Sequence, residues 1–120
     1  MQGLHLTADL SGCHGQRVSL TDPQALRELC VAHVTAAGLQ PVAELFHRFE
    51  ASGAGVTGVV LLAESHLALH TWPELKAVTL DAYVCNFGGD NSAKAHALIE
   101  ALVDAFEPEH VDRQRLERGR

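Results

Sequence analysis

The first residues of the chain alternate between apolar and polar side chains. Leu4, Leu6, Ala8 and Leu10 occupy one set of positions, and His5, Thr7 and Asp9 occupy the other. A period of two is typical of a strand with one buried face. We therefore predict a strand over residues 4–10, ended by a polar loop over residues 11–16.

Two later segments have helical periodicity. Thr21-Asp22-Pro23-Gln24 offers an N-cap, a proline allowed in the first turn and a capping box. Apolar or small side chains then recur at helical spacing, and Gly38 is placed to close this helix. In the second helix, Asn91 or Ser92 is the expected cap and Pro108 the expected stop. The residues at helical spacing are Leu26, Leu29, Cys30, His33 and Ala37 in the first helix, and Leu98, Ile99, Leu102 and Phe106 in the second.

Between the helices the period returns to two. Residues 41–49 are predicted to form a strand, and a loop of small residues, 51–55, leads into an apolar strand from Val56 to Ala63. A further strand is expected over residues 77–85, with a short last strand after the second helix. The positions predicted to share a face are Ala43, Leu45, His47 and Phe49 in the first of these strands, and Thr79, Asp81, Tyr83 and Cys85 in the later one.

This order of elements predicts an α+β fold, a two-layer sandwich in which helices cover one face of an antiparallel sheet. At 120 residues we expect one domain over residues 1–120. A chain of this size has little room for a deep cleft inside one copy. A site assembled between two copies is therefore plausible.

Composition and charge exclude several classes of function. The formal charge of −6 argues against a nucleic-acid partner. The basic cluster at 113–120 is interrupted by Glu117, and we predict a solvated tail there. No segment has the pattern of a signal peptide or a membrane span, so we expect a soluble cytoplasmic protein without a membrane partner. Three cysteines without a CxxC spacing are expected to be free thiols.

Reactive side chains concentrate in residues 64–74. Glu64-Ser65-His66 places a hydroxyl next to an imidazole, and an imidazole base can activate a hydroxyl as a nucleophile. His66 and His70 could both bind a metal, but no third ligand has convincing spacing, so we expect no metal site.

The segment His70-Thr71-Trp72-Pro73-Glu74, with Cys85 fifteen positions after His70, resembles the bacterial and archaeal S-adenosylmethionine decarboxylases. These are pyruvoyl enzymes made as one proenzyme chain. Further matching blocks are His47-Arg48-Phe49, Gly55-Val56-Thr57-Gly58-Val59-Val60, Glu64-Ser65-His66 and Asp81.

The resemblance implies self-cleavage between Glu64 and Ser65. Ser65 attacks the Glu64 carbonyl carbon, and elimination from the resulting ester leaves a pyruvoyl group in place of Ser65. By the same match His70 is the base for processing, and Thr57 stands where a serine usually assists it. Cys85 would return a proton to the substrate, Phe49 would stack on adenine, and Glu74 would bind the ribose hydroxyls. The resemblance also implies a homodimer of processed protomers, with sites near the subunit interface, that supplies the aminopropyl donor for spermidine.

The chemistry agrees with a cofactor of this type. Decarboxylation of an amino acid leaves a carbanion at the α-carbon, and a carbonyl group that forms a Schiff base provides the necessary electron sink. A pyridoxal enzyme would need an internal lysine, and neither Lys76 nor Lys94 lies in a recognisable site.

The spacing of Ser65 and His70 sets a geometric condition. Five positions apart in an uninterrupted strand, the two side chains point to opposite faces. We therefore expect the chain to bend at or near the cleavage site, where a strained peptide would favour the acyl shift.

Two alternatives remain open. Asn86 follows Cys85 where the family usually has glycine, Leu75-Lys76 replaces a more aromatic pair, and the loop before Gly55 lacks a usual proline. Pyruvoyl-dependent decarboxylation of arginine or ornithine is the first alternative. The second is a relative that binds a nucleoside or a partner without cutting itself.

Overall fold

The computed structural model describes residues 1–15, 17–51, 53–86 and 88–119. Gln16, the last residue of the expected first loop, and Arg120 lie outside this part. The elements in chain order are β1 (Gln2–Ser11), α1 (Pro23–Ala36), β2 (Pro41–Arg48), β3 (Val56–Leu62), β4 (Ser65–Trp72), the short 3₁₀ helix η1 (Pro73–Leu75), β5 (Ala77–Cys85), α2 (Ser92–Phe106) and β6 (His110–Gly119).

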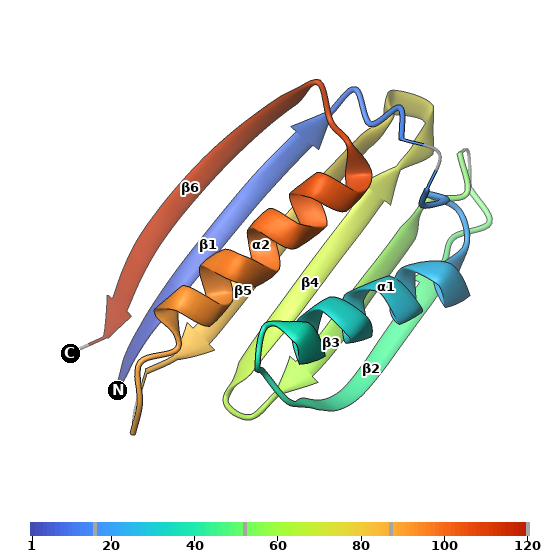
Figure 1. The fold of residues 1–120 in the computed structure, drawn as a ribbon. Coiled ribbons are helices and arrows are strands. Elements are labelled where there is room, and N and C mark those ends of the chain that lie inside the picture. The colour runs from blue at the N-terminus through green and yellow to red at the C-terminus, as the bar shows by residue number, and fades with distance from the viewer. Residues whose placement is uncertain (16, 52, 87, 120) are drawn as a thin grey trace.

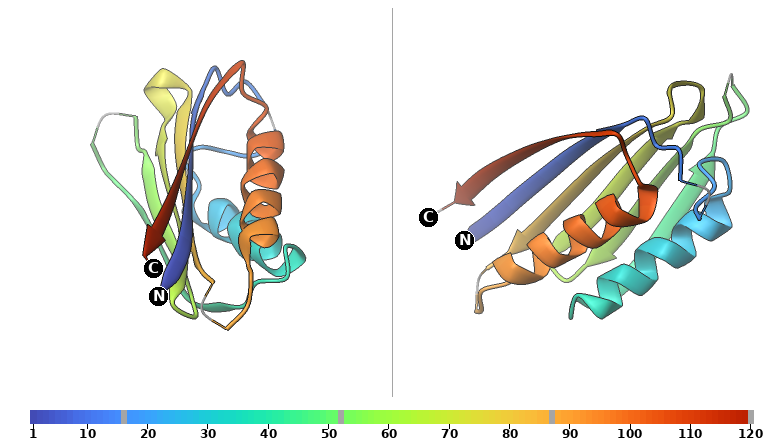
Figure 2. Two further views of the ribbon diagram at one scale, coloured as in Figure 1. Left: turned by 90° about the vertical axis from the view of Figure 1, so that its left-hand side faces the viewer. Right: turned by 45° about the horizontal axis from the view of Figure 1, so that its top comes forward.

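The described residues form one six-stranded sheet in the order β2-β3-β4-β5-β1-β6, and every neighbouring pair is antiparallel. Both helices lie on the same face of this sheet (Figure 1), and the edge-on view in Figure 2 shows the two layers. The predicted α+β two-layer sandwich is therefore confirmed.

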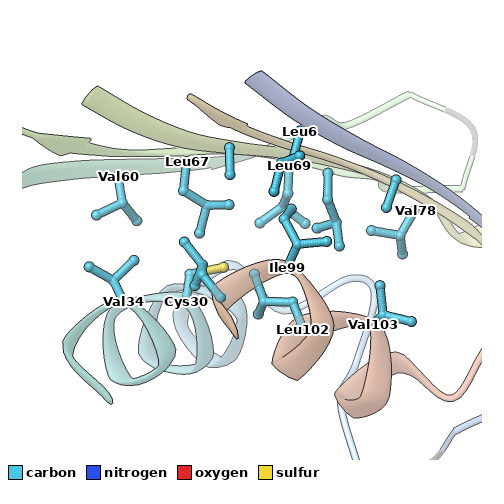
Figure 3. Close-up of a cluster of buried hydrophobic side chains, with 14 of the residues drawn as sticks. Leu6, Cys30, Val34, Val60, Leu67, Leu69, Val78, Ile99, Leu102 and Val103 are labelled. Carbon is cyan, nitrogen blue, oxygen red and sulfur yellow. The ribbon is translucent and has the colours of Figure 1, made fainter. Parts of the chain in front are cut away.

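The core lies between the helices and this face of the sheet. Figure 3 shows Val34 and Cys30 of α1 and Ile99 and Leu102 of α2 directed toward the sheet. Alternate residues of each central strand supply the other half of the core, among them Leu4, Leu6, Leu67, Leu69, Val78 and Leu80. Because side chains alternate along a strand, the same packing directs the intervening polar residues to the opposite, open face.

The helix ends follow the sequence signals in part. Asp22 caps α1 by accepting hydrogen bonds from the N–H groups of Gln24 and Ala25, and Gly38 follows the helix at a φ of 86°. Asn91 occupies the N-cap position of α2, but its side chain makes no capping hydrogen bond there. Within the described residues, no helix is long and apolar enough to cross a membrane.

The expected last strand is present and its side chains are almost all exposed, but the prediction of a tail after it is wrong, because the strand continues through the basic cluster to Gly119. Residues His110–Gly119 form β6, which pairs with β1 along the whole length of β1, from Gln2 to Ser11. Backbone hydrogen bonds hold this edge strand, so it needs no apolar alternation, and charged side chains protect an exposed edge. Arg113 contributes through a two-pronged ion pair with Glu100 of α2.

Thr71 is the only buried polar residue in the part of the chain that the structure describes. Its hydroxyl accepts a hydrogen bond from the Val56 N–H at 2.9 Å and donates one to the Leu20 carbonyl at 2.7 Å. It thus ties the start of β3 and the segment before α1 to β4. A buried backbone group that loses its partner costs free energy.

We predict that Thr71→Val lowers the free energy of unfolding by about 2 kcal/mol or more, because the change keeps the shape but leaves two backbone groups unpaired. Urea denaturation measures the change. Thr7→Val is the matched control, since Thr7 is half-buried in a central strand and its hydroxyl has no hydrogen bond within the described residues. Equal stabilities for the two variants would contradict the assigned role of Thr71.

Candidate active site

The peptide between Glu64 and Ser65 lies at a tight turn. Leu62 of β3 pairs directly with Ser65 of β4, so Ala63 and Glu64 alone form the connection. Glu64 has a φ of 55°, in the left-handed region that costs free energy for a residue with a side chain. The backbone strain expected near the cleavage site is therefore present on the residue that supplies the carbonyl carbon.

Ser65 contacts the end of β5. Its Oγ accepts a hydrogen bond from the backbone N–H of Cys85 at 3.0 Å. Cys85 belongs to the open face and is 7% exposed, and it lines a shallow pocket of about 430 Å³ with Met1, Glu64 and Tyr83. Antiparallel pairing thus brings together the candidate serine, the preceding glutamate and the candidate cysteine. We call Glu64, Ser65 and Cys85 the cleavage cluster.

The segment after Cys85 is held by two asparagines. Asn91 Nδ2 donates to the Cys85 carbonyl at 2.9 Å, and the Asn91 N–H donates to Asn86 Oδ1 at 2.8 Å. Asn86 Nδ2 contacts Ser92 Oγ at 3.1 Å, and the Asn86 N–H donates to the Gln2 carbonyl. Each amide orientation is fixed by its partners, because a carbonyl can only accept and an N–H can only donate. The backbone beside Cys85 is therefore anchored from both sides.

A second group lies toward the other end of β4. Thr57 and His70 are directly opposite each other on β3 and β4, and Thr57 Oγ1 is 2.9 Å from His70 Nδ1. A hydroxyl at this distance fixes the orientation of the imidazole. The structure thus brings together two residues that the resemblance links to processing.

This group continues into a pocket of about 200 Å³ that Thr57 and His70 line together with Phe49, Trp72 and Glu74. Phe49 and Trp72 are partly exposed, so neither is a core residue. The Trp72 ring lies 5.8 Å from the His70 ring, centroid to centroid. We call Phe49, Thr57, His70, Trp72 and Glu74 the aromatic cluster.

Glycine allows the loop between β2 and β3 to approach this pocket closely. At Gly53, which has a φ of 85°, an added Cβ would collide with the Glu74 carboxylate. At Gly55 it would collide with the Thr71 carbonyl. The small residues of this loop therefore let it pass beside Glu74.

One chain does not bring the two clusters together. The bend lies in the turn before Ser65, whereas β4 continues without interruption from Ser65 to Trp72. Five residues of extended strand separate Ser65 from His70 by about 16 Å. Alternation places Ser65 on the helix side with Leu67 and Leu69, and His70 on the open face. The expected bend therefore exists, but it does not place Ser65 beside His70.

The open face carries an apolar patch over strands β2, β3 and β4. Leu45 is 70% exposed and Leu61 is 47% exposed. We define the open-face patch as Ala43, Leu45, Val59, Leu61 and Ala68, which face one another in the strand register. No element of the described residues covers it (Figure 2).

A histidine cluster that the sequence did not predict lies on the same face. His5 Nε2 lies 3.3 Å from Asp81 Oδ1, although this buried nitrogen makes no hydrogen bond within the described residues. The rings of His5, His66 and Tyr83 are neighbours, with centroids 5.8–6.4 Å apart. Burial lowers the pKa of His66, and the neighbouring His5 lowers it further. The polar alternation of the strand over 77–85 was the available signal.

The other two cysteines differ from Cys85 in position. Both belong to the hydrophobic core. Burial raises the pKa of the Cys30 thiol to about 12 and also raises the pKa of Cys13. Neither thiol lies in the cleavage cluster, so Cys85 is the cysteine that can take part in chemistry at Ser65.

Comparison with known proteins gives one consistent result. The family model for S-adenosylmethionine decarboxylase matches residues 4–119. A protein of Aquifex aeolicus (strain VF5) named S-adenosylmethionine decarboxylase proenzyme is 39% identical over 117 residues, which are 98% of this chain and 81% of the relative. A protein of Hydrogenobaculum sp. (strain Y04AAS1) with the same name is 38% identical, with the same coverage.

Among solved structures, the chain is similar to the crystal structure of the adenosylmethionine decarboxylase from Aquifex aeolicus VF5. The TM-score is 0.83 at 36% sequence identity, over 98% of this chain and 90% of that one. These matches confirm the resemblance inferred from the motif at residues 64–74. The chain therefore belongs to the S-adenosylmethionine decarboxylase family.

Proposed function

We propose that this protein is a self-processing, pyruvoyl-dependent decarboxylase of S-adenosylmethionine. The observation that carries the proposal is the cleavage cluster. A serine hydroxyl directly follows a left-handed glutamate and lies against the end of β5, where the candidate cysteine is found. This geometry suits the conversion of Ser65 into a ketone.

Processing would begin with attack of Ser65 Oγ on the Glu64 carbonyl carbon. Relief of the left-handed conformation at Glu64 favours opening of that peptide. The later elimination needs a base, and an imidazole suits it near neutral pH. His70 is the proposed base, and Thr57 would orient its ring through the 2.9 Å contact with Nδ1.

A ketone derived from Ser65 would supply the electron sink for decarboxylation. Glu64 precedes Ser65 and the Cys85 N–H donates to its hydroxyl, and the 430 Å³ pocket that these two residues line would give a substrate space next to a ketone at position 65. Cys85 would hold a proton at Sγ for return to the α-carbon of the substrate. Its position on the open face aims the thiol to the side from which a substrate would enter.

The aromatic cluster favours a nucleoside substrate over arginine or ornithine. Phe49 and Trp72 offer flat apolar surfaces for a purine ring, and Glu74 offers a carboxylate for ribose hydroxyls. The product would serve as aminopropyl donor for spermidine synthesis in the cytoplasm.

Two copies of the chain would form the complete site. His70 is about 16 Å from Ser65 along one strand, which is beyond the reach of proton transfer. A second copy packed on the open-face patch would bury Leu45 and Leu61 and could bring its aromatic cluster to the cleavage cluster of the first. A homodimer would cover the exposed apolar patch, and it would bring together the two clusters that lie apart in one chain.

We predict that purified protein consists of two fragments that meet between Glu64 and Ser65, and that Ser65→Ala stays one chain because it lacks the attacking hydroxyl. Intact-mass spectrometry measures both. A wild-type chain that remains whole would favour a non-catalytic binding protein. Release of carbon dioxide is then assayed with S-adenosylmethionine, arginine and ornithine. Turnover of arginine or ornithine alone would reject the proposed substrate.

Cys85→Ala is expected to cut itself yet to decarboxylate about 10²–10⁴-fold more slowly, because it lacks the proton donor. Mass spectrometry and carbon dioxide release separate the two effects. Cys13→Ala is the control, since Cys13 is also a small buried thiol but lies outside the cleavage cluster. Full activity of Cys85→Ala would remove this thiol from the mechanism.

Coexpression of two inactive variants tests whether the site is shared. His70→Ala alone should remain uncut, but it should be cut when paired with Ser65→Ala, which supplies an intact His70 from the second copy. The matched control pairs His70→Ala with the double variant Ser65→Ala/His70→Ala, where no intact imidazole is available. Mass spectrometry of differently tagged chains measures cutting. A His70→Ala chain that stays whole beside Ser65→Ala would contradict the shared site.

A further inference from the structure

Asn91 occupies a position where its side chain is expected to stabilise α2. An N-cap asparagine normally accepts a hydrogen bond from the N–H of the second or third helical residue, and this contributes about 1 kcal/mol. Here the side chain makes no such bond, and Asp90 Oδ1 instead accepts from the Ser92 N–H at 2.9 Å. The Asn91 amide is therefore engaged elsewhere.

Its partner is the backbone of the cleavage cluster. Asn91 Nδ2 donates to the carbonyl of Cys85, while the N–H of Cys85 donates to Ser65 Oγ. Asn86 Oδ1 accepts from the Asn91 N–H, which fixes Asn91 in turn. A continuous chain of hydrogen bonds thus runs from Asn86 through Asn91 and Cys85 to Ser65.

We propose that Asn91 is a positioning residue for self-cleavage. It fixes the Cys85 backbone so that the Cys85 N–H points at Ser65 Oγ, the atom that changes partners during maturation. This inference rests on the proposed function. In this role the backbone N–H of Cys85 acts during self-cleavage, whereas its thiol acts later on the substrate.

The chemistry shows where that N–H acts. In the acyl shift, a bond forms between Ser65 Oγ and the Glu64 carbonyl carbon, the peptide C–N bond breaks, and the hydroxyl proton ends on the Ser65 nitrogen. In the elimination, a base removes the Ser65 α-hydrogen, a double bond forms between Cα and Cβ, and the Cβ–Oγ bond breaks. Oγ leaves as part of the new carboxylate of Glu64, and hydrolysis with loss of ammonia completes the ketone.

In the acyl shift Oγ donates electron density to the Glu64 carbonyl carbon, whereas in the elimination it takes up the electron pair of the broken Cβ–Oγ bond and gains negative charge. A hydrogen-bond donor already aimed at an atom that gains charge stabilises the transition state without reorganisation. The Cys85 N–H, 3.0 Å from Oγ, is such a donor. Weakening its support should therefore slow the breakdown of the ester more than its formation.

Asn91→Asp tests this with a side chain of almost the same shape. It lacks the Nδ2 donor and would place a carboxylate beside the Cys85 carbonyl, whereas an aspartate is an excellent N-cap at the positive end of a helix. We expect self-cleavage to slow by about tenfold or more, the effect of one lost hydrogen bond in the transition state. We expect the melting temperature to stay equal or to rise. Asn91→Ala, with no capping group, should show the same delay.

Hydroxylamine identifies the delayed step, because it cleaves esters and spares peptide bonds. Uncut Asn91→Asp and Asn91→Ala should release a fragment that begins with an unmodified Ser65 amine. Asp90→Asn is the control in the same loop, since the Asp90 carboxylate is hydrogen-bonded to the backbone and side chain of Ser92 and not to Cys85. It should cut at the wild-type rate.

The outcomes separate this inference from the proposed function. Cutting of both Asn91 variants at the wild-type rate overturns the role of Asn91 and leaves the proposed function intact. Delayed chains that resist hydroxylamine also overturn it, because the block then precedes the ester. A wild-type chain that never cuts overturns the proposed function itself.

Discussion

The alternation of side chains along β4 is the constraint on which the rest of the structure depends. Leu67 and Leu69 are buried against the helices, and this fixes the register of β4 between β3 and β5. A slip of one residue would expose both leucines and turn His66 and His70 into the core. The same apolar burial that stabilises the sheet therefore decides which reactive groups face outward, and at what distance from Ser65.

Much of the fold was predictable because local signals agree with it. The alternation at residues 4–10, Asp22 before Pro23 and Gly38 after the helix each specify one conformation, and each is found. A short last strand was expected, but the full length of β6 was not, because backbone pairing with β1 holds it and a polar edge strand has no apolar period. Its ten residues look like a tail until their neighbour is known.

The candidate site was predictable in its members but not in its arrangement. The motif at 64–74 with Cys85 contains the cleavage cluster and three residues of the aromatic cluster, and the matching blocks before it add Phe49 and Thr57. The structure places Thr57 Oγ1 2.9 Å from His70 Nδ1. Their division into two clusters follows from a straight β4, which a motif does not reveal. Asn91 was expected as a helix cap. Its side chain instead binds the Cys85 carbonyl, while Asp90 Oδ1 accepts a hydrogen bond from the N–H of Ser92, the first residue of α2.

The topology explains how this fold could tolerate the proposed break. Residues 1–64 hold β1, β2 and β3, and residues 65–119 hold β4, β5 and β6. In the sheet order β2-β3-β4-β5-β1-β6 these strands interleave, so β1 of the first part lies between β5 and β6 of the second. The two parts share three strand pairings as well as one core, and α2 packs on both β1 and β5. A cut between Glu64 and Ser65, at the end of the turn that joins β3 to β4, would leave these strand pairings and the helix packing in place. Separation of the pieces would require unfolding of the whole sheet, so backbone scission there changes the chemistry of one terminus and leaves the scaffold around it in place.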